Sequence, residues 1–154
     1  MARIAFVCWG NICRSPMAER VARSMADERG LDVEVESFGV SAEESGNPID
    51  RRARNLLERA GYDAAGHRAR RITGADIARA DLVVAAEPMH VDMLRGLAPE
   101  ATNLRLLNDY NPAYPPGTPL QDPWYGQAEG FNDTLADVEA AVPGVLDELE
   151  ALPR

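Results

Sequence analysis

The chain has 154 residues, of which 45% are hydrophobic, and a formal net charge of −9. That length is enough for one domain with a buried core, while the acidic balance argues against nucleic acid and anionic membranes as partners. No run approaches the roughly 20 apolar residues of a membrane span, and the apolar stretch of residues 4–7 is too short for a signal-peptide core.

Strands and helices alternate along the sequence. Apolar or alternating runs predict strands over residues 3–7, 32–36, 81–86 and 103–107, and helical patterns predict helices over 17–29, 50–60, 73–80, 89–96 and 130–152. We expect the last helix to be interrupted or bent near Pro143 and Gly144. The alternation predicts a single α/β domain whose parallel sheet is covered by helices on both faces. In such sheets ligands bind beyond the carboxyl ends of the strands.

The segment after the first strand reads Cys-Trp-Gly-Asn-Ile-Cys-Arg-Ser-Pro, from Cys8 to Pro16. Gly10 and Asn11 readily accept left-handed backbone angles, which lets several N–H groups turn toward one point. Arg14 can bind two phosphate oxygens at once through its planar guanidinium group. Cys8 supplies a nucleophilic sulfur, and the N-terminus of the following helix stabilises both an anion and a thiolate. The segment therefore predicts a catalytic phosphate-binding loop.

Each of these residues also has a purely structural interpretation. Cys8 alone could be a small buried apolar residue, and Arg14 alone an exposed helix residue, whereas their combination with the intervening Gly-Asn favours catalysis. Downstream, Asp122 precedes Pro123, and an Asp-Pro pair is commonly only a turn former. Beside a cysteine nucleophile, Asp122 becomes the best candidate for a general acid. Asp109 ranks behind it, because it lacks a following proline and a pair of aromatic neighbours.

Two motifs together resemble those of the low-molecular-weight protein tyrosine phosphatases. The segment from Cys8 to Pro16 is similar to that family's Cys-x-Gly-Asn-x-Cys-Arg-Ser-Pro loop, and Asp-Pro-Trp-Tyr-Gly, from Asp122 to Gly126, resembles its general-acid loop. Their order and spacing also match, so the resemblance covers residues 1–154 as one phosphatase domain. It implies a four-stranded parallel sheet in the order 2-1-3-4, no cofactor, no metal, and phosphotyrosine-containing proteins as substrates.

The resemblance also implies a two-step reaction. Cys8 attacks the phosphorus of an aryl phosphate as its thiolate while Asp122 protonates the leaving oxygen, and a phosphocysteine forms. Asp122 then takes a proton from the water that releases phosphate. Arg14 holds the phosphate oxygens through both steps. The implied phosphate-binding residues are Trp9, Gly10, Asn11, Ile12, Cys13, Arg14 and Ser15.

A further group of residues is expected to brace the loop. In the family, positions that match Asn11, Ser15, Ser37 and His67 form a hydrogen-bond network. Ser15 is the member that faces the nucleophile and stabilises its thiolate. The structural alternatives are that Ser15 caps the helix, that Ser37 ends a strand, and that His67 is a surface loop residue. His67 and His90 have no ligand-like spacing to the cysteines, which argues against a metal site.

Cys13 has two interpretations. Cys8 and Cys13 are the only two cysteines, which is no disulfide framework and predicts a reducing, cytoplasmic setting. A second thiol close to an oxidisable thiolate can trap its sulfenic acid as a disulfide and so protect it. Alternatively, Cys13 is a small apolar residue that packs beneath the loop. Both interpretations stay open at this point.

The substrate rim is where the chain departs from the family. We expect this rim to comprise Trp9, Glu43, Trp124 and Tyr125. Trp9 is bulkier than its counterpart in many relatives and favours flat aromatic substrates. Glu43, with Glu44 beside it, takes a place that is commonly aromatic in the family, and it would repel acidic phosphopeptides. After the third predicted strand, Glu87 replaces a usual Asp.

Three other functions fit parts of the sequence. Related phosphatases act on phosphoarginine and carry Thr before the second loop cysteine, where this chain has Ile12. Arsenate reductases of the same fold need more cysteines than Cys8 and Cys13. A silent phosphate-binding module is expected to lack Cys8, Arg14 or Asp122, and all three are present. We therefore predict a protein tyrosine phosphatase that is a monomer or a weak dimer, with a protein arginine phosphatase or a silent module as alternatives.

Overall fold

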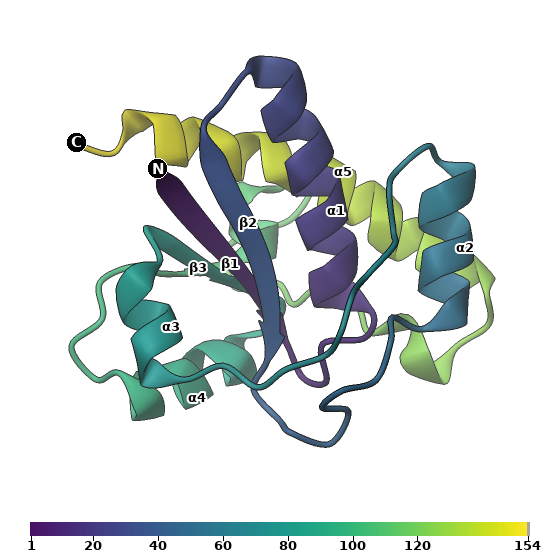
Figure 1. Ribbon diagram of the computed structural model, residues 1–154, viewed down its shortest axis with the longest axis horizontal. Helices are drawn as coiled ribbons and strands as arrows, with labels where there is room; N and C mark the ends of the chain where they lie inside the picture. The colour runs from purple at the N-terminus through teal and green to yellow at the C-terminus, as the bar shows by residue number, and fades with distance from the viewer. Residues whose placement is uncertain (154) are drawn as a thin grey trace.

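Four parallel strands form the central sheet of the computed structural model, which describes residues 1–153 (Figure 1). The strands are β1 (Ala2–Cys8), β2 (Val33–Gly39), β3 (Leu82–Ala85) and β4 (Leu104–Leu106), and their order across the sheet is β2-β1-β3-β4. Every pairing between neighbouring strands is parallel. The predicted sheet and its order 2-1-3-4 are therefore confirmed.

Helices cover both faces of this sheet. On one face lie α1 (Arg14–Arg29), α2 (Arg51–Arg59) and α5 (Glu129–Ala151), and on the other lie α3 (Gly74–Arg79) and α4 (Pro88–Leu97) (Figure 1). Two short 3-10 helices, η1 (Leu107–Tyr110) and η2 (Pro123–Tyr125), follow β4 along the chain. Within residues 1–153, no helix combines the length and the apolar character needed to cross a membrane.

β1 separates two apolar cores because its side chains alternate between the faces of the sheet. Ile4, Phe6 and Cys8 belong to the core shared with α1, α2 and α5. Ala5 and Val7 belong to the core shared with α3 and α4. All five are almost completely buried, as expected for a strand of a parallel sheet that is covered on both sides. This packing holds Cys8 at the carboxyl end of the central strand.

α1 begins directly beside this strand end, at Arg14, which is earlier than the predicted residue 17. Cys13 is at the N-cap position, and no side chain caps the helix. Pro16 lies in the first turn, where its missing N–H has no cost because first-turn N–H groups have no partner within the helix. The uncapped N-terminus of α1 therefore adjoins the loop formed by residues 8–13.

α5 excludes the interruption that the sequence predicts near residues 143 and 144, whereas the bend predicted as the other outcome stays a prediction. The helix runs without interruption from Glu129 to Ala151, with Pro143 inside it. An internal proline costs about 3 kcal/mol. Its neighbours Val142, Val145 and Leu146 are completely buried, and burial of each such side chain contributes about 1.5–3 kcal/mol. Packing against the sheet therefore outweighs the local preference of proline.

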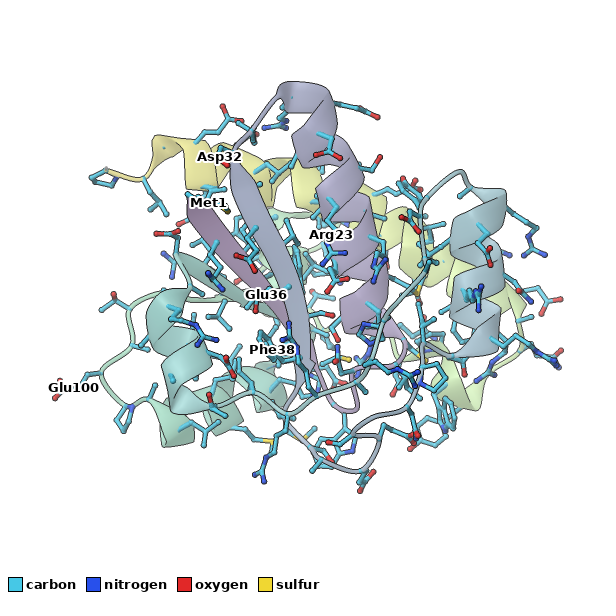
Figure 2. All side chains as sticks on the ribbon, viewed as in Figure 1. Met1, Arg23, Asp32, Glu36, Phe38 and Glu100 are labelled. Atoms are coloured by element: carbon cyan, nitrogen blue, oxygen red, sulfur yellow. The ribbon has the colours of Figure 1, made fainter. Side chains whose placement is uncertain are left out.

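Arginine side chains cover the outer edge of β2. Arg23 on α1 donates to the carbonyl of Val35 through Nε at 3.1 Å and Nη2 at 3.0 Å. Arg70 donates to the carbonyl of Ser37 through Nε at 3.4 Å. Figure 2 shows Arg23 on α1 beside β2. Farther along, Gly39 pairs with the backbone of residues 70–72. Successive edge carbonyls of β2 are thus bonded within the molecule.

Candidate active site

The carboxyl end of β1 opens into a pocket that gathers the predicted catalytic residues. Cys8, Arg14 and Asp122 all line it, although Asp122 lies far along the chain. All the predicted rim residues line it as well. The full lining is Cys8, Trp9, Gly10, Ile12, Cys13, Arg14, Glu43, Glu44, Asp122, Trp124 and Tyr125. Asn11 and Ser15 are buried behind the loop instead of lining the pocket.

The loop between β1 and α1 has the backbone of an anion-binding turn. Asn11 has a φ of 62°, in the left-handed region, where asparagine is tolerated better than most residues. The backbone N–H groups of residues 10–15 meet no acceptor from residues 1–153. Such N–H groups, gathered at a helix N-terminus, attract and orient an anion.

Gly39 allows the end of β2 to approach this loop closely. A Cβ atom at this position would lie 2.7 Å from the carbonyl oxygen of Trp9 and 3.2 Å from the carbonyl carbon of Gly10. The next residues continue the contact, since the N–H groups of Val40 and Ser41 donate to the carbonyls of Cys8 and Trp9 at 2.9 and 3.0 Å. Backbone bonds therefore hold the outer side of the loop.

Arg14 is buried and held from one side. Its Nη1 donates to the carbonyl of Leu120 at 2.8 Å and lies 2.7 Å from Oε2 of Glu87. Its Nη2 lies 3.6 Å from Oδ2 of Asp122. The side chain is only 3% exposed, so these contacts fix the orientation of the guanidinium group. A fixed guanidinium group is suited to bind two oxygens of one phosphate.

A chain of buried hydrogen bonds runs from Cys8 to Glu19. Cys8 Sγ lies 3.0 Å from Ser15 Oγ. Asn11 donates through Nδ2 to Ser15 Oγ at 2.8 Å and to Ser37 Oγ at 3.0 Å. Ser37 Oγ then donates to Oε1 of Glu19 at 2.9 Å. Three of these four bonds have a fixed direction, because Asn11 can only donate through Nδ2 and the Glu19 carboxylate can only accept. In the bond between Cys8 and Ser15 either side chain can donate.

The hydroxyl hydrogen of Ser15 has two acceptors within reach. One is Cys8 Sγ at 3.0 Å, and the other is the carbonyl of Phe38 at 3.3 Å. A charged sulfur is the stronger acceptor, so ionisation of Cys8 draws this hydrogen to the thiolate. The alternative that Ser15 caps α1 is wrong, because the helix has no side-chain cap. Ser15 lies inside the first turn with its hydroxyl facing the thiol.

Two further contacts fix Asn11. Its Oδ1 accepts from the backbone N–H of Arg70 at 3.0 Å, and its carbonyl oxygen lies 2.6 Å from Nε2 of His67. A carbonyl only accepts, so His67 carries a hydrogen on Nε2. Burial lowers the pKa of His67, which is 8% exposed. The surface interpretation of His67 is therefore wrong, and so is the idea that Ser37 ends a strand, because β2 continues to Gly39.

Asp122 approaches the pocket from an exposed segment. Its Oδ1 accepts the backbone N–H of Trp124 at 3.0 Å at the start of η2. Its side chain is 33% exposed, and Tyr125 is 88% exposed. The guanidinium group of Arg52 lies over the ring of Trp124, 5.2 Å from its centroid, and over the ring of Phe131, at 4.7 Å. This side of the pocket is held by few contacts.

The rim formed by residues 9, 43 and 44 is both aromatic and acidic. Trp9 Nε1 donates to Oε2 of Glu43 at 3.1 Å, which fixes the indole ring. Glu44 Oε2 accepts from Asn47 Nδ2 at 2.6 Å. The side chain of Glu44 also lies over Gly10, where a Cβ atom would be 3.2 Å from Glu44 Cγ. Two carboxylate groups therefore line the pocket beside the cationic Arg14.

Cys13 lies under the loop and is 6% exposed. Burial, followed by the nearby charges of Asp50 and Cys8, raises its pKa. Both cysteines are free, with no disulfide between them. A thiol with a raised pKa contributes little thiolate at neutral pH. Cys13 therefore packs as a small apolar side chain in this state, while a protective disulfide with Cys8 stays a prediction.

Two charged contacts of the site were missed in the sequence. In the sequence Glu87 stands out only as a replacement of a usual Asp, whereas in the structure it binds Arg14. Its place just beyond the end of β3, next to β1 in the sheet, is a signal that could have assigned it. Glu19, the last acceptor of the hydrogen-bond chain, is a buried acid on α1. A charged residue facing a core in a predicted helix calls for a partner.

Other contributors carry no sequence signal. The carbonyl of Leu120 and the guanidinium group of Arg52 reach the site only through tertiary packing. Asp109, the competing acid candidate, instead accepts the N–H of Gly117 at 2.8 Å and does not line the pocket. Across the described part of the chain, no three His, Cys, Asp or Glu side chains are grouped as metal ligands.

The sequence matches one protein family over nearly its whole length. The family described as low molecular weight phosphotyrosine protein phosphatase matches residues 3–152. A low molecular weight protein-tyrosine-phosphatase of Streptomyces coelicolor is 43% identical over 150 residues, covering 94% of this chain and 91% of the relative. The low molecular weight protein-tyrosine phosphatase A of Mycobacterium tuberculosis is 39% identical over 149 residues, covering 94% and 89%.

Solved structures share the fold over the same extent. A protein tyrosine phosphatase from Entamoeba histolytica, with Hepes in the active site, superposes with a TM-score of 0.92 at 26% identity, covering 98% of each chain. YfkJ from Bacillus subtilis superposes with a TM-score of 0.90 at 28% identity, covering 98% of this chain and 96% of YfkJ.

Proposed function

Because this chain belongs to the low molecular weight phosphotyrosine protein phosphatase family, we propose that it hydrolyses phosphotyrosine in proteins through a phosphocysteine intermediate. One observation carries the proposal: Cys8, Arg14 and Asp122 line one pocket. A nucleophile, an anion-binding group and an acid within one pocket are the minimum set for phosphoryl transfer without a cofactor.

Cys8 acts as the nucleophile in the first step. The N-terminus of α1 and the hydroxyl of Ser15, 3.0 Å from Cys8 Sγ, both favour the thiolate. The sulfur attacks phosphorus, an S–P bond forms, and the bond between phosphorus and the phenolic oxygen breaks. When the S–P bond later breaks, the same hydroxyl stabilises the departing sulfur.

Arg14 and the loop N–H groups stabilise the phosphoryl group during its transfer. The N–H groups of residues 10–15 have no acceptor from residues 1–153, so they are available to phosphate oxygens. Arg14 is already oriented by Leu120 and Glu87. Because these donors are fixed before the substrate arrives, they need little reorganisation in the transition state.

Asp122 handles the proton in both steps. Its Oδ1 is held by the N–H of Trp124, and its Oδ2 lies 3.6 Å from Arg14 Nη2. Oδ2 is therefore the oxygen next to the bound phosphoryl group and carries the proton to the leaving phenolic oxygen. The resulting carboxylate then accepts a proton from the water that attacks the phosphocysteine, and phosphate is released.

The rim supports an aromatic phosphate on a protein as the substrate. Trp9, Trp124 and Tyr125 are the aromatic side chains that line the pocket, and each is exposed at the surface. They can stack on a flat ring while leaving its peptide outside. Phosphoarginine is the alternative substrate, because its planar guanidinium group could contact the carboxylates of Glu43 and Glu44.

Release of p-nitrophenol from p-nitrophenyl phosphate tests the activity. We expect turnover by the wild type, competitive inhibition by vanadate, and no turnover by Cys8→Ser. Asp122→Ala should accumulate the intermediate, and mass spectrometry of digested protein should find phosphate on Cys8 in both Asp122→Ala and Asp122→Ala/Cys13→Ser. An inactive wild type would support the silent phosphate-binding module. Phosphate on Cys13 would show that Cys13, and not Cys8, is the nucleophile.

Matched peptides that carry phosphotyrosine, phosphoarginine or phosphoserine at one position test the substrate class. We expect kcat/KM to be highest for phosphotyrosine and to fall for that peptide when Trp124 is replaced by Ala. A higher kcat/KM for phosphoarginine would establish the alternative.

A further inference from the structure

His90 on α4 is buried without a hydrogen-bond partner. It is 0% exposed, and neither ring nitrogen has a partner among residues 1–153. Only one other buried side-chain atom in that range, Oδ1 of Asn108, shares this condition. A buried polar group without a partner destabilises the fold by about 1–3 kcal/mol. The buried neighbours of His90 on the same helix, Val91 and Leu94, are apolar, so packing alone does not explain an imidazole here.

The ring lies behind the residue that orients Arg14. His90 Nε2 is 3.8 Å from Oε2 of Glu87, and the same oxygen is 2.7 Å from Nη1 of Arg14. Glu87 is the N-cap residue of α4, and its carbonyl accepts the N–H of His90 at 3.0 Å. One oxygen of the Glu87 carboxylate thus lies near both the guanidinium group and the imidazole.

We propose that His90 is a positioning residue that holds Glu87, and through Glu87 orients Arg14 for the phosphoryl group. The inference deepens the proposed function and rests on it. Phosphate oxygens bound to the guanidinium group offset part of its positive charge, which weakens its pull on Glu87. A shift of the carboxylate by about 1 Å toward His90 then makes a hydrogen bond from Nε2–H. His90 thereby holds the carboxylate close to Arg14 throughout the reaction.

The charges around the ring agree with a neutral donor. The groups that face it are Arg14 at the start of α1, Glu87 at the start of α4 and Asp122 before η2. Burial, followed by the charge of Arg14, lowers the pKa of His90 to about 4, against opposing effects of Glu87 and Asp122. At neutral pH the ring therefore has a single N–H to offer.

Three substitutions of His90 test the proposal, since each keeps a different part of the ring's chemistry. His90→Gln keeps an N–H at the place of Nε2, His90→Asn keeps one at the place of Nδ1, and His90→Leu keeps neither. The measurements are kcat/KM for p-nitrophenyl phosphate, the Kd of inorganic phosphate by calorimetry, and the free energy of unfolding in urea.

For His90→Leu we expect phosphate to bind about tenfold more weakly and kcat/KM to fall about tenfold, the scale of one hydrogen bond to a charged group. Stability should stay equal or increase, because an unpartnered polar group is removed. His90→Gln should restore phosphate affinity and kcat/KM, and His90→Asn should not. Val91→Ala, on the same helix, is the control that lowers stability without changing the Kd of phosphate.

A double-mutant cycle identifies the route through Glu87. In the Glu87→Gln background, His90→Leu should change the Kd of phosphate by less than about twofold. Unchanged phosphate binding and kcat/KM in His90→Leu would overturn the proposal, as would a full effect of His90→Leu in the Glu87→Gln background. Wild-type turnover decides the proposed function separately, because phosphate binding is measured without turnover.

Discussion

The two sides of the pocket are built differently. On one side, Cys8, Asn11, Arg14 and Ser15 are at most 3% exposed, and each is bonded to other elements of the fold. On the other side, the side chain of Asp122 is 33% exposed and is held by one backbone N–H and a distant contact to Arg14. Many contacts hold the proposed phosphate-binding loop, and few hold the segment that carries Asp122, the proposed acid.

In the proposed mechanism, this difference separates two contributions to catalysis. The loop presents fixed donors to charge that develops on the phosphoryl group, and such preorganisation requires burial and many hydrogen bonds. The acid must contact a leaving group that belongs to a protein, so its segment must stay accessible. Substitutions in the loop should therefore affect both stability and chemistry, whereas substitutions in the acid segment should affect chemistry alone.

The same chemical change on the two sides should give the largest contrast. Arg14→Lys keeps the charge but loses the planar group that binds two oxygens, so kcat/KM for p-nitrophenyl phosphate should fall about a thousandfold. Arg52→Lys keeps a cation over the Trp124 ring and should change kcat/KM by less than about threefold. Equal losses in steady-state assays would mean that the two sides are not distinct.

Asp122→Asn should remove proton transfer without unfolding the protein. The kcat/KM for a phosphotyrosine peptide, which reports the step that forms the phosphocysteine, should fall about a hundredfold, while the free energy of unfolding in urea changes by less than about 0.5 kcal/mol, because the side chain is partly exposed. The loss should be smaller for p-nitrophenyl phosphate, whose leaving group needs less protonation. An equal loss for both substrates would contradict the role of Asp122 as an acid.

Asn11 should contribute mainly to stability. Asn11→Ala removes the hydrogen bonds to Ser15, Ser37 and the N–H of Arg70. It also places alanine, which has no polar side chain to support a left-handed backbone, at a φ of 62°. The free energy of unfolding should therefore fall by about 3 kcal/mol. Asn11→Gly avoids the backbone strain and should lose about 1 kcal/mol less. Identical values in urea titrations would show that the left-handed backbone contributes nothing.

Acid should weaken the loop side through its buried histidines. The pKa of His90, about 4, and that of His67 lie below the unfolded value near 6.5. At pH values between the folded and unfolded pKa, the unfolded chain binds more protons than the folded one. The stability that the neutral histidines allow is therefore present above about pH 6.5 and is lost as the pH falls. For His90 alone we expect the free energy of unfolding to fall by about 1 kcal/mol between about pH 7 and 5.5. His90→Leu should remove that part of the slope in urea unfolding, and an unchanged slope would contradict it.

The smallest effect should come from the acidic rim. Glu43→Gln removes a charge and keeps an acceptor for the indole N–H of Trp9. The kcat/KM for phosphotyrosine peptides with acidic neighbours should rise about two- to threefold, and that for basic neighbours should not, because exposed charge interactions are weak. The difference should shrink at high salt. A rise for both kinds of peptide would point to shape instead of charge.

Sequence reasoning succeeded where chemistry is local. The strands, their parallel arrangement and the loop motif follow from patterns of a few residues, and the left-handed Asn11 follows from its residue type. It failed only for the predicted interruption of α5, where packing of Val142 and Leu146 overrides Pro143. Local preferences are small compared with the burial of a helix face, so they lose wherever tertiary contacts are extensive.

Parts of the site lay beyond local patterns. Arg14 contacts Glu87 and the carbonyl of Leu120, which belong to segments distant from it in the chain. A sequence motif does not show which distant groups will contact its side chains. His90 shows the same limit, because its position in the sequence argues only against a metal site. Its significance appears once its burial and its distance to Glu87 are known.

The arginine side chains that cover the edge of β2 affect whether two copies of this protein can join through their sheets. An edge strand with unbonded carbonyls is a template for strand addition and for aggregation. Here Arg23 and Arg70 occupy the carbonyls of Val35 and Ser37 and bring positive charge to that edge. A foreign strand would have to displace both guanidinium groups before it could pair. The two arginine side chains that bond to the edge of β2 thus also oppose the pairing of β2 with a strand of another molecule.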